Sequence, residues 1–162
     1  METTTGFRYL SLKDLKQEFQ NGEAPSGFLA SLGELTGELG YKLEETELFL
    51  RLKDLENFPN QEVFLALKGE HPVGILHLSL YPTLIEGIVA EIMALVITES
   101  CKGCGLGRRL VDLAKTKTRE LDIDRVIVRS NSLRQESHGF YNHLGFTRKK
   151  TQHYYEIKLE GC

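Results

Sequence analysis

The sequence contains no tryptophan, only four prolines and only three cysteines among 162 residues. No run of apolar residues approaches the ~18 that a membrane-spanning helix needs. The start, METTTGFRYLSLKDL, lacks a cationic stretch followed by an apolar one, so we expect no secretory signal peptide. Cys101, Cys104 and Cys162 cannot all pair within one chain, which favours a reducing compartment. We therefore expect a cytoplasmic protein with no membrane insertion.

Net charge and length limit the expected partners of the protein and its number of domains. The net charge of −3 argues against nucleic acid or an anionic membrane surface as the main partner. A chain of this length buries roughly 70% of its unfolded surface as one domain. No repeat, linker or low-complexity tract interrupts it, so we predict a single domain over residues 1–162.

The pattern of apolar residues predicts a helical first third followed by alternating strands and helices. Helices are expected at 26–39, 43–58, 106–121 and 134–143. Strands are expected at 63–67, 73–81, 91–97 and 125–130, with two short final strands at 146–149 and 154–159. The turn GEHP at 69–72 predicts a hairpin between the first two strands.

In two of these elements, the apolar residues also predict which sides are buried. The strand 91–97 is apolar on both faces after Glu91, which predicts a central strand covered on both sides. The helix that follows has an apolar stripe, and we expect the stripe to be buried: Leu106, Leu110, Leu113, Ala114 and Leu121.

Between this strand and this helix lies the glycine-rich turn CKGCGLGRRL, residues 101–110. Glycine allows a close approach of the backbone to a ligand, and the first N–H groups of a helix have no partner within the helix. Together they form a site for an anion such as a phosphate. Arg108 and Arg109 oppose the helix dipole in the first turn, a cost of a few tenths of a kcal/mol that a bound anion would offset. A tight turn with solvated arginines is the alternative.

The common nucleotide motifs do not fit this turn. No Lys-Ser or Lys-Thr pair follows the last glycine, as a P-loop requires. No glycine stands three residues after Gly105 or Gly107, as the dinucleotide-binding fingerprint requires.

Segment 91–146 resembles the GNAT superfamily of N-acetyltransferases. The family signature [R/Q]-x-x-G-x-[G/A] matches residues 102–107 except at its first position, where Lys102 stands. The segment HGFYNHLGF, 138–146, resembles the second signature, and the order of elements fits nearly the whole chain. The resemblance implies an α/β (α+β) fold: a mixed, largely antiparallel sheet of six or seven strands flanked by about four helices.

The resemblance also implies how acetyl-CoA binds. In this family the central strand splays from its neighbour and offers backbone groups to the pantetheine arm; one backbone N–H stabilises the oxyanion. The matching stretch here is Leu95, Val96 and Ile97. The pyrophosphate is implied to lie on the turn formed by Lys102, Gly103, Cys104, Gly105, Leu106, Gly107 and Arg108. Where the family often has asparagine this chain has Arg134, and Asn131 lies three residues earlier, so either is a candidate for contact with acetyl-CoA.

For catalysis the resemblance implies that Tyr141 protonates or hydrogen-bonds the departing thiolate. Tyrosine is ordinarily a weaker acid than a thiol, which favours hydrogen bonding as the larger effect. Glu91 is the first choice as general base for the amine, helped by burial or a relay water. Glu86 is the alternative; His77 and His138 are further titratable candidates. A single Cys-x-x-Cys pair is a weak zinc signal, so we expect no metal.

These observations predict an acyl-CoA-dependent N-acetyltransferase. It would move an acetyl group from acetyl-CoA to a primary amine of a small molecule or peptide, directly in a ternary complex. A non-catalytic acyl-CoA-binding or sensor module on the same fold is the first alternative, and another phosphate-ligand enzyme is the second. The acceptor and the oligomeric state stay open, a homodimer included.

Overall fold

In the computed structural model, residues 3–4, 6–19, 24–133 and 135–159 are described. They contain a six-stranded sheet in the order β1-β2-β3-β4-β5-β6. Five strands have three residues or more: β2 (Phe7–Ser11), β3 (Gln61–Lys68), β4 (His71–Thr83), β5 (Gly87–Ile97) and β6 (Val126–Val128). The sixth, β1, is the pair Thr3–Thr4. All neighbours are antiparallel except β5 and β6, so the predicted mixed, largely antiparallel class is confirmed.

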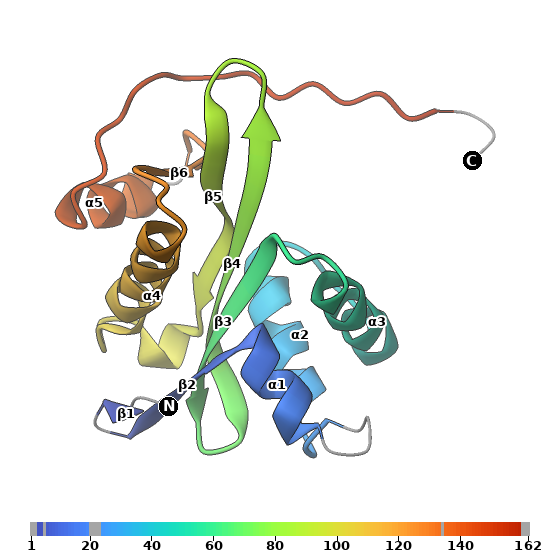
Figure 1. Ribbon diagram of the computed structural model, residues 1–162. Helices are drawn as coiled ribbons and strands as arrows, with labels where there is room; N and C mark the ends of the chain where they lie inside the picture. The colour runs from blue at the N-terminus through green and yellow to red at the C-terminus, as the bar shows by residue number, and fades with distance from the viewer. Residues whose placement is uncertain (1–2, 5, 20–23, 134, 160–162) are drawn as a thin grey trace. The chain divides into compact units, whose positions relative to one another are not determined.

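The predicted hairpin at 69–72 is confirmed, and a second, longer hairpin joins β4 to β5 (Figure 1). β3 begins at Gln61, opposite Ser79, so the end of the β4–β5 hairpin extends beyond β3. No helix in the described ranges combines the length and apolarity needed to cross a membrane.

Three helices cover one face of the sheet, here called the helical face (Figure 1). They are α1 (Leu12–Glu18), α2 (Phe28–Glu38) and α3 (Glu45–Glu56). Their apolar stripes pack with alternate residues of the strands into one core, which includes Leu15, Phe28, Leu32, Leu48, Leu52, Val63, Leu65 and Val96. Burial of apolar surface at this core is the main force that holds the layer together.

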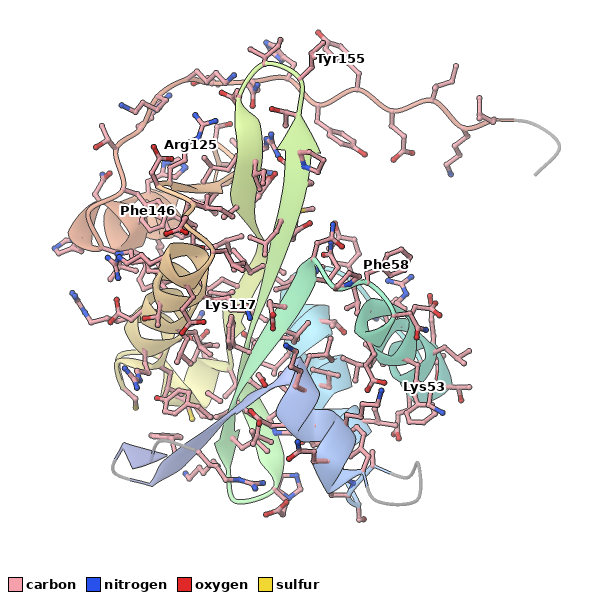
Figure 2. The ribbon with its side chains drawn as sticks, in the orientation of Figure 1. Lys53, Phe58, Lys117, Arg125, Phe146 and Tyr155 are labelled. Atoms are coloured by element: carbon pink, nitrogen blue, oxygen red, sulfur yellow. The ribbon has the colours of Figure 1, made fainter. Side chains whose placement is uncertain are left out.

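The opposite face of the sheet is covered by α4 (Leu106–Glu120) (Figure 1). Lys117 of α4, which Figure 2 labels, reaches the buried Glu62 of β3, with Nζ 2.9 Å from Oε1. Glu62 alternates with the core residue Val63, which places it on the α4 face. The buried residues of α4 are Leu106, Leu110, Val111, Ala114 and Thr118. The expectation for Leu121 is wrong because it follows the last helical turn, and it is 45% exposed. Leu113, also expected to be buried, is only half-buried.

The first third of the chain is not entirely helical, contrary to the sequence interpretation. β2 lies beside β3, and α1 follows it directly. Ser11 caps α1 in a capping box: its Oγ accepts from the Asp14 N–H at 3.3 Å, and Asp14 Oδ2 accepts from the Ser11 N–H at 2.7 Å. With five α-helices, the described residues exceed the expected four.

β5 departs from the expected fully covered strand. The pairing register with β4 shifts between His77 and Leu78, and Met93 is the extra residue on β5. Such a β-bulge turns a strand and is frequent beside functional sites. Met93 is 54% exposed as a result, so β5 is not buried on both faces along its whole length.

The described residues divide into two compact units, one ending at Val128 and the other beginning at Arg129. The single-domain expectation stays a prediction. The second unit contains α5 (Gln135–His143), which ends before Gly145 at φ 85° as predicted. The two final strands are not formed: residues 146–149 and 154–159 belong to no helix or strand. Apolar alternation makes a strand only where a neighbour completes its hydrogen bonds, and Tyr154 and Ile157 are instead exposed.

Candidate functional site

β5 has an open edge over its second half. It pairs with β6 only at Ala90, Glu91 and Ile92, and beyond Ile92 the described pairing of β5 continues with β4 alone. The Thr98 N–H donates to the Val73 carbonyl at 2.9 Å, on the β4 side. Because backbone groups alternate sides along an antiparallel strand, Val96 also faces β4. Leu95 and Ile97 therefore direct their N–H and C=O groups toward the open edge.

The glycine-rich turn begins as a type II β-turn over residues 101–104. The Cys104 N–H donates to the Cys101 carbonyl at 3.3 Å. Lys102 has φ −61° and ψ 145°, and Gly103 has φ 78°, the values this turn requires at its two central positions. The conformation of Gly103 explains the glycine there, since other residues rarely adopt it.

Gly105 ends the turn and starts α4. It is the N-cap of α4 with φ 80°, and no side chain caps it. The first N–H groups of the helix need partners from outside the helix. A Cβ built on Gly103 or Gly105 would meet no atom within 4 Å, so open space lies over both residues. The backbone here has the shape and polarity that a phosphate group needs.

The cations around this turn have different roles. Lys102 is exposed and forms an ion pair with Glu99. Arg108 is exposed as well. Arg109, however, is half-buried, and its guanidinium lies over the Tyr9 ring, 5.9 Å from the centroid. Burial raises the pKa of Tyr9 above its ordinary value. Of the two arginines, Arg108 is the one presented to solvent beside the turn.

Three other residues of the turn differ in their exposure to solvent. Leu106 is buried, so only its backbone can serve a ligand. Cys101 is buried and Cys104 is exposed, and both are free thiols. Across the described part of the chain, no three His, Cys, Asp or Glu side chains gather as a metal site.

A row of polar side chains lies on the helical face of the sheet. Ser79 is opposite both Gln61 of β3 and Glu91 of β5, so these three share a face. Glu91 is in the middle of β5 and only 3% exposed, so its carboxylate is held inside the protein. Its Oε2 accepts a hydrogen bond from the hydroxyl of Tyr81.

The same row continues to His77. Gln61 Nε2 donates to Ser79 Oγ at 2.9 Å, and Gln61 Oε1 lies 2.8 Å from His77 Nε2. Burial lowers the pKa of His77 below its ordinary value. Burial thus favours the neutral form of the His77 imidazole. We name Gln61, His77, Ser79, Tyr81 and Glu91 the polar row.

Sequence reasoning missed the contact between Tyr81 and Glu91. The alternation of His77, Ser79 and Tyr81 on one face was readable, but the partner of Tyr81 depends on the hairpin register. Glu86, the alternative base, lies in the turn of this hairpin. Its Oε1 is 3.6 Å from Arg125 Nη1, and its carbonyl accepts from Arg125 Nη2 at 3.0 Å.

The remaining predicted residues lie in the second unit. The Tyr141 ring packs edge-on against Phe140 and Phe146, with centroids 5.3 and 5.6 Å away. Asn131 Oδ1 accepts from the Leu133 N–H at 2.9 Å, and the Asn131 carbonyl lies 3.2 Å from His138 Nε2. Arg134 lies outside the described residues.

Comparisons with known proteins identify a family through its model and a shared fold through solved structures. The model of the acetyltransferase (GNAT) family matches residues 28–146. No curated protein matches the sequence significantly. Among solved structures, a GNAT family acetyltransferase from Staphylococcus aureus has a TM-score of 0.69 at 19% identity, over 93% of this chain and 97% of that one. Glucosamine-6-phosphate N-acetyltransferase from Arabidopsis thaliana has a TM-score of 0.72 at 17% identity, over 97% and 100%. An aminoglycoside N-acetyltransferase in complex with CoA has a TM-score of 0.74 at 11% identity, over 94% and 95%.

Proposed function

The chain belongs to the acetyltransferase (GNAT) family, and on that premise we propose that it transfers an acetyl group from acetyl-CoA to a primary amine. The acceptor is a small molecule or a peptide. The transfer is direct, within a complex of both substrates with the protein. The observation that carries the proposal is the open edge of β5 leading into an uncapped, glycine-rich start of α4.

Acetyl-CoA fits the residues present. The backbone amides of Gly103, Gly105, Gly107 and Arg108 would hold the pyrophosphate, where a Cβ at Gly103 or Gly105 would meet only open space. Arg108 and Lys102 would add positive charge beside it. Leu95, Val96 and Ile97 would border the pantetheine arm, with hydrogen bonds from Leu95 and Ile97. Asn131 and Arg134 are kept as candidate contacts on the resemblance alone.

The chemistry assigned to this chain is polarisation and proton transfer. Bound acetyl-CoA supplies the acetyl thioester. The acceptor nitrogen attacks its carbonyl carbon, the C–S bond breaks, and the electron pair leaves on sulfur. The backbone N–H of Leu95 stabilises the negative charge that develops on the carbonyl oxygen. The carboxylate of Glu91 accepts the proton that the amine loses, directly or through a water.

Tyr141 is the proposed hydrogen-bond donor to the departing thiolate, on its match to the family's tyrosine. A donor there lowers the cost of releasing sulfur as an anion. The ring contacts with Phe140 and Phe146 would fix the ring that carries the hydroxyl.

The amine group of the acceptor is a further part of the proposal. Relatives of similar fold are named for glucosamine 6-phosphate and aminoglycosides, both of which carry amines. An amine acceptor also fits a site with a buried carboxylate.

The free thiols Cys101 and Cys104 fit a reducing compartment, and we propose the cytoplasm as the location.

The test is turnover with acetyl-CoA and a panel of amines: glucosamine 6-phosphate, neamine, spermidine and a lysine-containing peptide. CoA is measured by chromatography, because exposed Cys104 would react with a thiol reagent. We expect CoA and N-acetylated amine in equal amounts, with sequential two-substrate kinetics. Ping-pong kinetics would contradict direct transfer. Binding of acetyl-CoA without turnover of any amine would favour the sensor alternative.

A further inference from the structure

The hydrogen bond between Tyr81 and Glu91 joins two strands across the long hairpin. Tyr81 is opposite Val89, and Glu91 lies two residues further along β5, on the same face. A long side chain reaches this diagonal neighbour. Glu91 is 3% exposed, whereas Tyr81 is half-buried at the border of the polar row.

The polar row divides into two hydrogen-bonded groups. The amide of Gln61 bonds with Ser79 and His77, while the Tyr81 hydroxyl bonds with Glu91. Ser79 lies directly opposite Glu91, but its described hydrogen bond goes to Gln61. Tyr81 is thus the β4 side chain that bonds the carboxylate.

The place of this bond in the hairpin matters for the geometry of the carboxylate. β3 pairs with β4 only as far as Ser79, and Asn60 extends the contact by two hydrogen bonds of 2.8 Å with Leu80. Tyr81 is the next residue. A hydrogen bond from a hydroxyl to a carboxylate is charge-assisted and strong, so it fixes the rotation of the Glu91 side chain. A proton acceptor has to lie within hydrogen-bond reach of the proton it takes.

We propose that Tyr81 is a positioning residue of the acetyl transfer: its hydroxyl holds the carboxylate of Glu91 in the orientation that accepts the proton of the amine. This role rests on the proposed function. It acts through Glu91, so removing the hydroxyl weakens turnover and leaves the binding of acetyl-CoA unchanged. Once Glu91 is replaced by glutamine, no proton acceptor is left for the hydroxyl to position.

The experiment is a double-mutant cycle on the amine of the panel that the wild-type protein acetylates fastest. Tyr81→Phe keeps the ring and removes the hydroxyl, and we expect kcat to fall about 10-fold while the KM and Kd for acetyl-CoA change less than about 2-fold. We expect Glu91→Gln to lower kcat further than Tyr81→Phe does. The double variant Tyr81→Phe/Glu91→Gln should be no slower than Glu91→Gln alone, since residues that act as a unit are not additive.

Thr83→Val is the matched control for the hairpin. It removes the hydrogen bonds of Thr83 Oγ1 with the Glu86 N–H and the Gly87 carbonyl in the same hairpin and should retain wild-type kcat. A Tyr81→Phe variant with wild-type kcat overturns the proposal, as does a double variant that loses the product of both single effects. So does a Thr83→Val variant that loses as much kcat as Tyr81→Phe, because hairpin rigidity would then explain the result. A wild-type protein without acetyl-CoA binding or turnover overturns the proposed function itself, and this role with it.

Discussion

The two sides of the proposed site are built from different parts of the chain. The edge of β5 and the start of α4 present backbone groups from one continuous segment, 95–108. The polar row presents side chains from three strands, at positions as far apart as Gln61 and Glu91. The first depends on glycine conformation, and the second depends on strand register.

This difference predicts how each side responds to substitution. On the backbone side, the proposed ligand contacts come from main-chain groups, so we expect binding to change most where a substitution fills the space over Gly103 or Gly105. On the polar row, removal of a single functional group should change turnover without changing affinity for acetyl-CoA. The following substitutions test whether binding and turnover separate in this way.

The largest effect is expected on the polar row. Glu91→Gln keeps the shape of the side chain but removes the proton acceptor, so kcat should fall about 100- to 1,000-fold with the Kd for acetyl-CoA unchanged. Steady-state kinetics and calorimetry measure the two quantities. Glu86→Gln, which removes an exposed carboxylate five residues earlier, is the control and should stay active. An active Glu91→Gln variant would remove Glu91 from the mechanism.

On the backbone side, Gly105→Glu should weaken binding of acetyl-CoA about 100-fold, because it places bulk and negative charge where the pyrophosphate is proposed to lie. Gly87→Glu is the matched control: Gly87 also has a positive φ, 72° against 80°, and also has open space around it. Both variants share the backbone strain. Calorimetry should separate them, and equal affinities would show that our placement of the pyrophosphate is wrong.

Tyr141→Phe is expected to have a smaller effect. Loss of one hydrogen bond to a charged leaving group lowers kcat about 10-fold. The affinity for acetyl-CoA should stay within about 2-fold, since the ring and its contacts remain. Tyr155→Phe, at a side chain that is 86% exposed, serves as the control in the same kinetic assay. Equal rates in all three proteins would end the catalytic role of Tyr141.

The smallest effect concerns the stability of the polar row. Burial lowers the pKa of His77 in the folded protein, so as pH falls below about 6.5 the unfolded chain takes up a proton first. The contribution of neutral His77 to the free energy of unfolding is present above that pH. It is lost as the pH falls toward the pKa of His77 in the folded protein. His77→Asn should therefore lose less melting temperature than the wild type between pH 7.5 and 5.5. A drop as large as in the wild type would contradict this. Each protein is referenced to its own value at pH 7.5, which cancels the cost of the substitution.

The contrast between local conformation and strand register also explains which elements the sequence predicts correctly. Periodicity and flanking turn residues located α2, α3, α4, α5 and the strands β3 to β6. It missed β2, since the short segment Phe7–Ser11 is a strand only beside β3, and it missed α1, although Ser11 and Asp14 form a readable capping box. It placed strands at 146–149 and 154–159 that do not form. Local patterns cannot reveal the partner that a strand needs.

For the site, the backbone side was readable because glycines at 103 and 105 are required by local conformation. The polar row was not, because the Tyr81–Glu91 contact requires the register of a hairpin that includes a bulge at Met93. Arg109 shows the same limit: its sequence position indicates an anion contact, whereas the fold places it over Tyr9.

The most direct test of the account is to observe the backbone amides while CoA is added. In a titration of the 15N-labelled protein with CoA, followed by NMR, we predict the largest shifts at the amides of Leu95, Ile97, Gly103, Gly105 and Gly107. The amides of Gly69 and Gly87, in the two hairpin turns, should not move. Shifts that leave residues 95–108 unchanged, or that occur equally at the two hairpin turns, would contradict a CoA site on the edge of β5 and the start of α4.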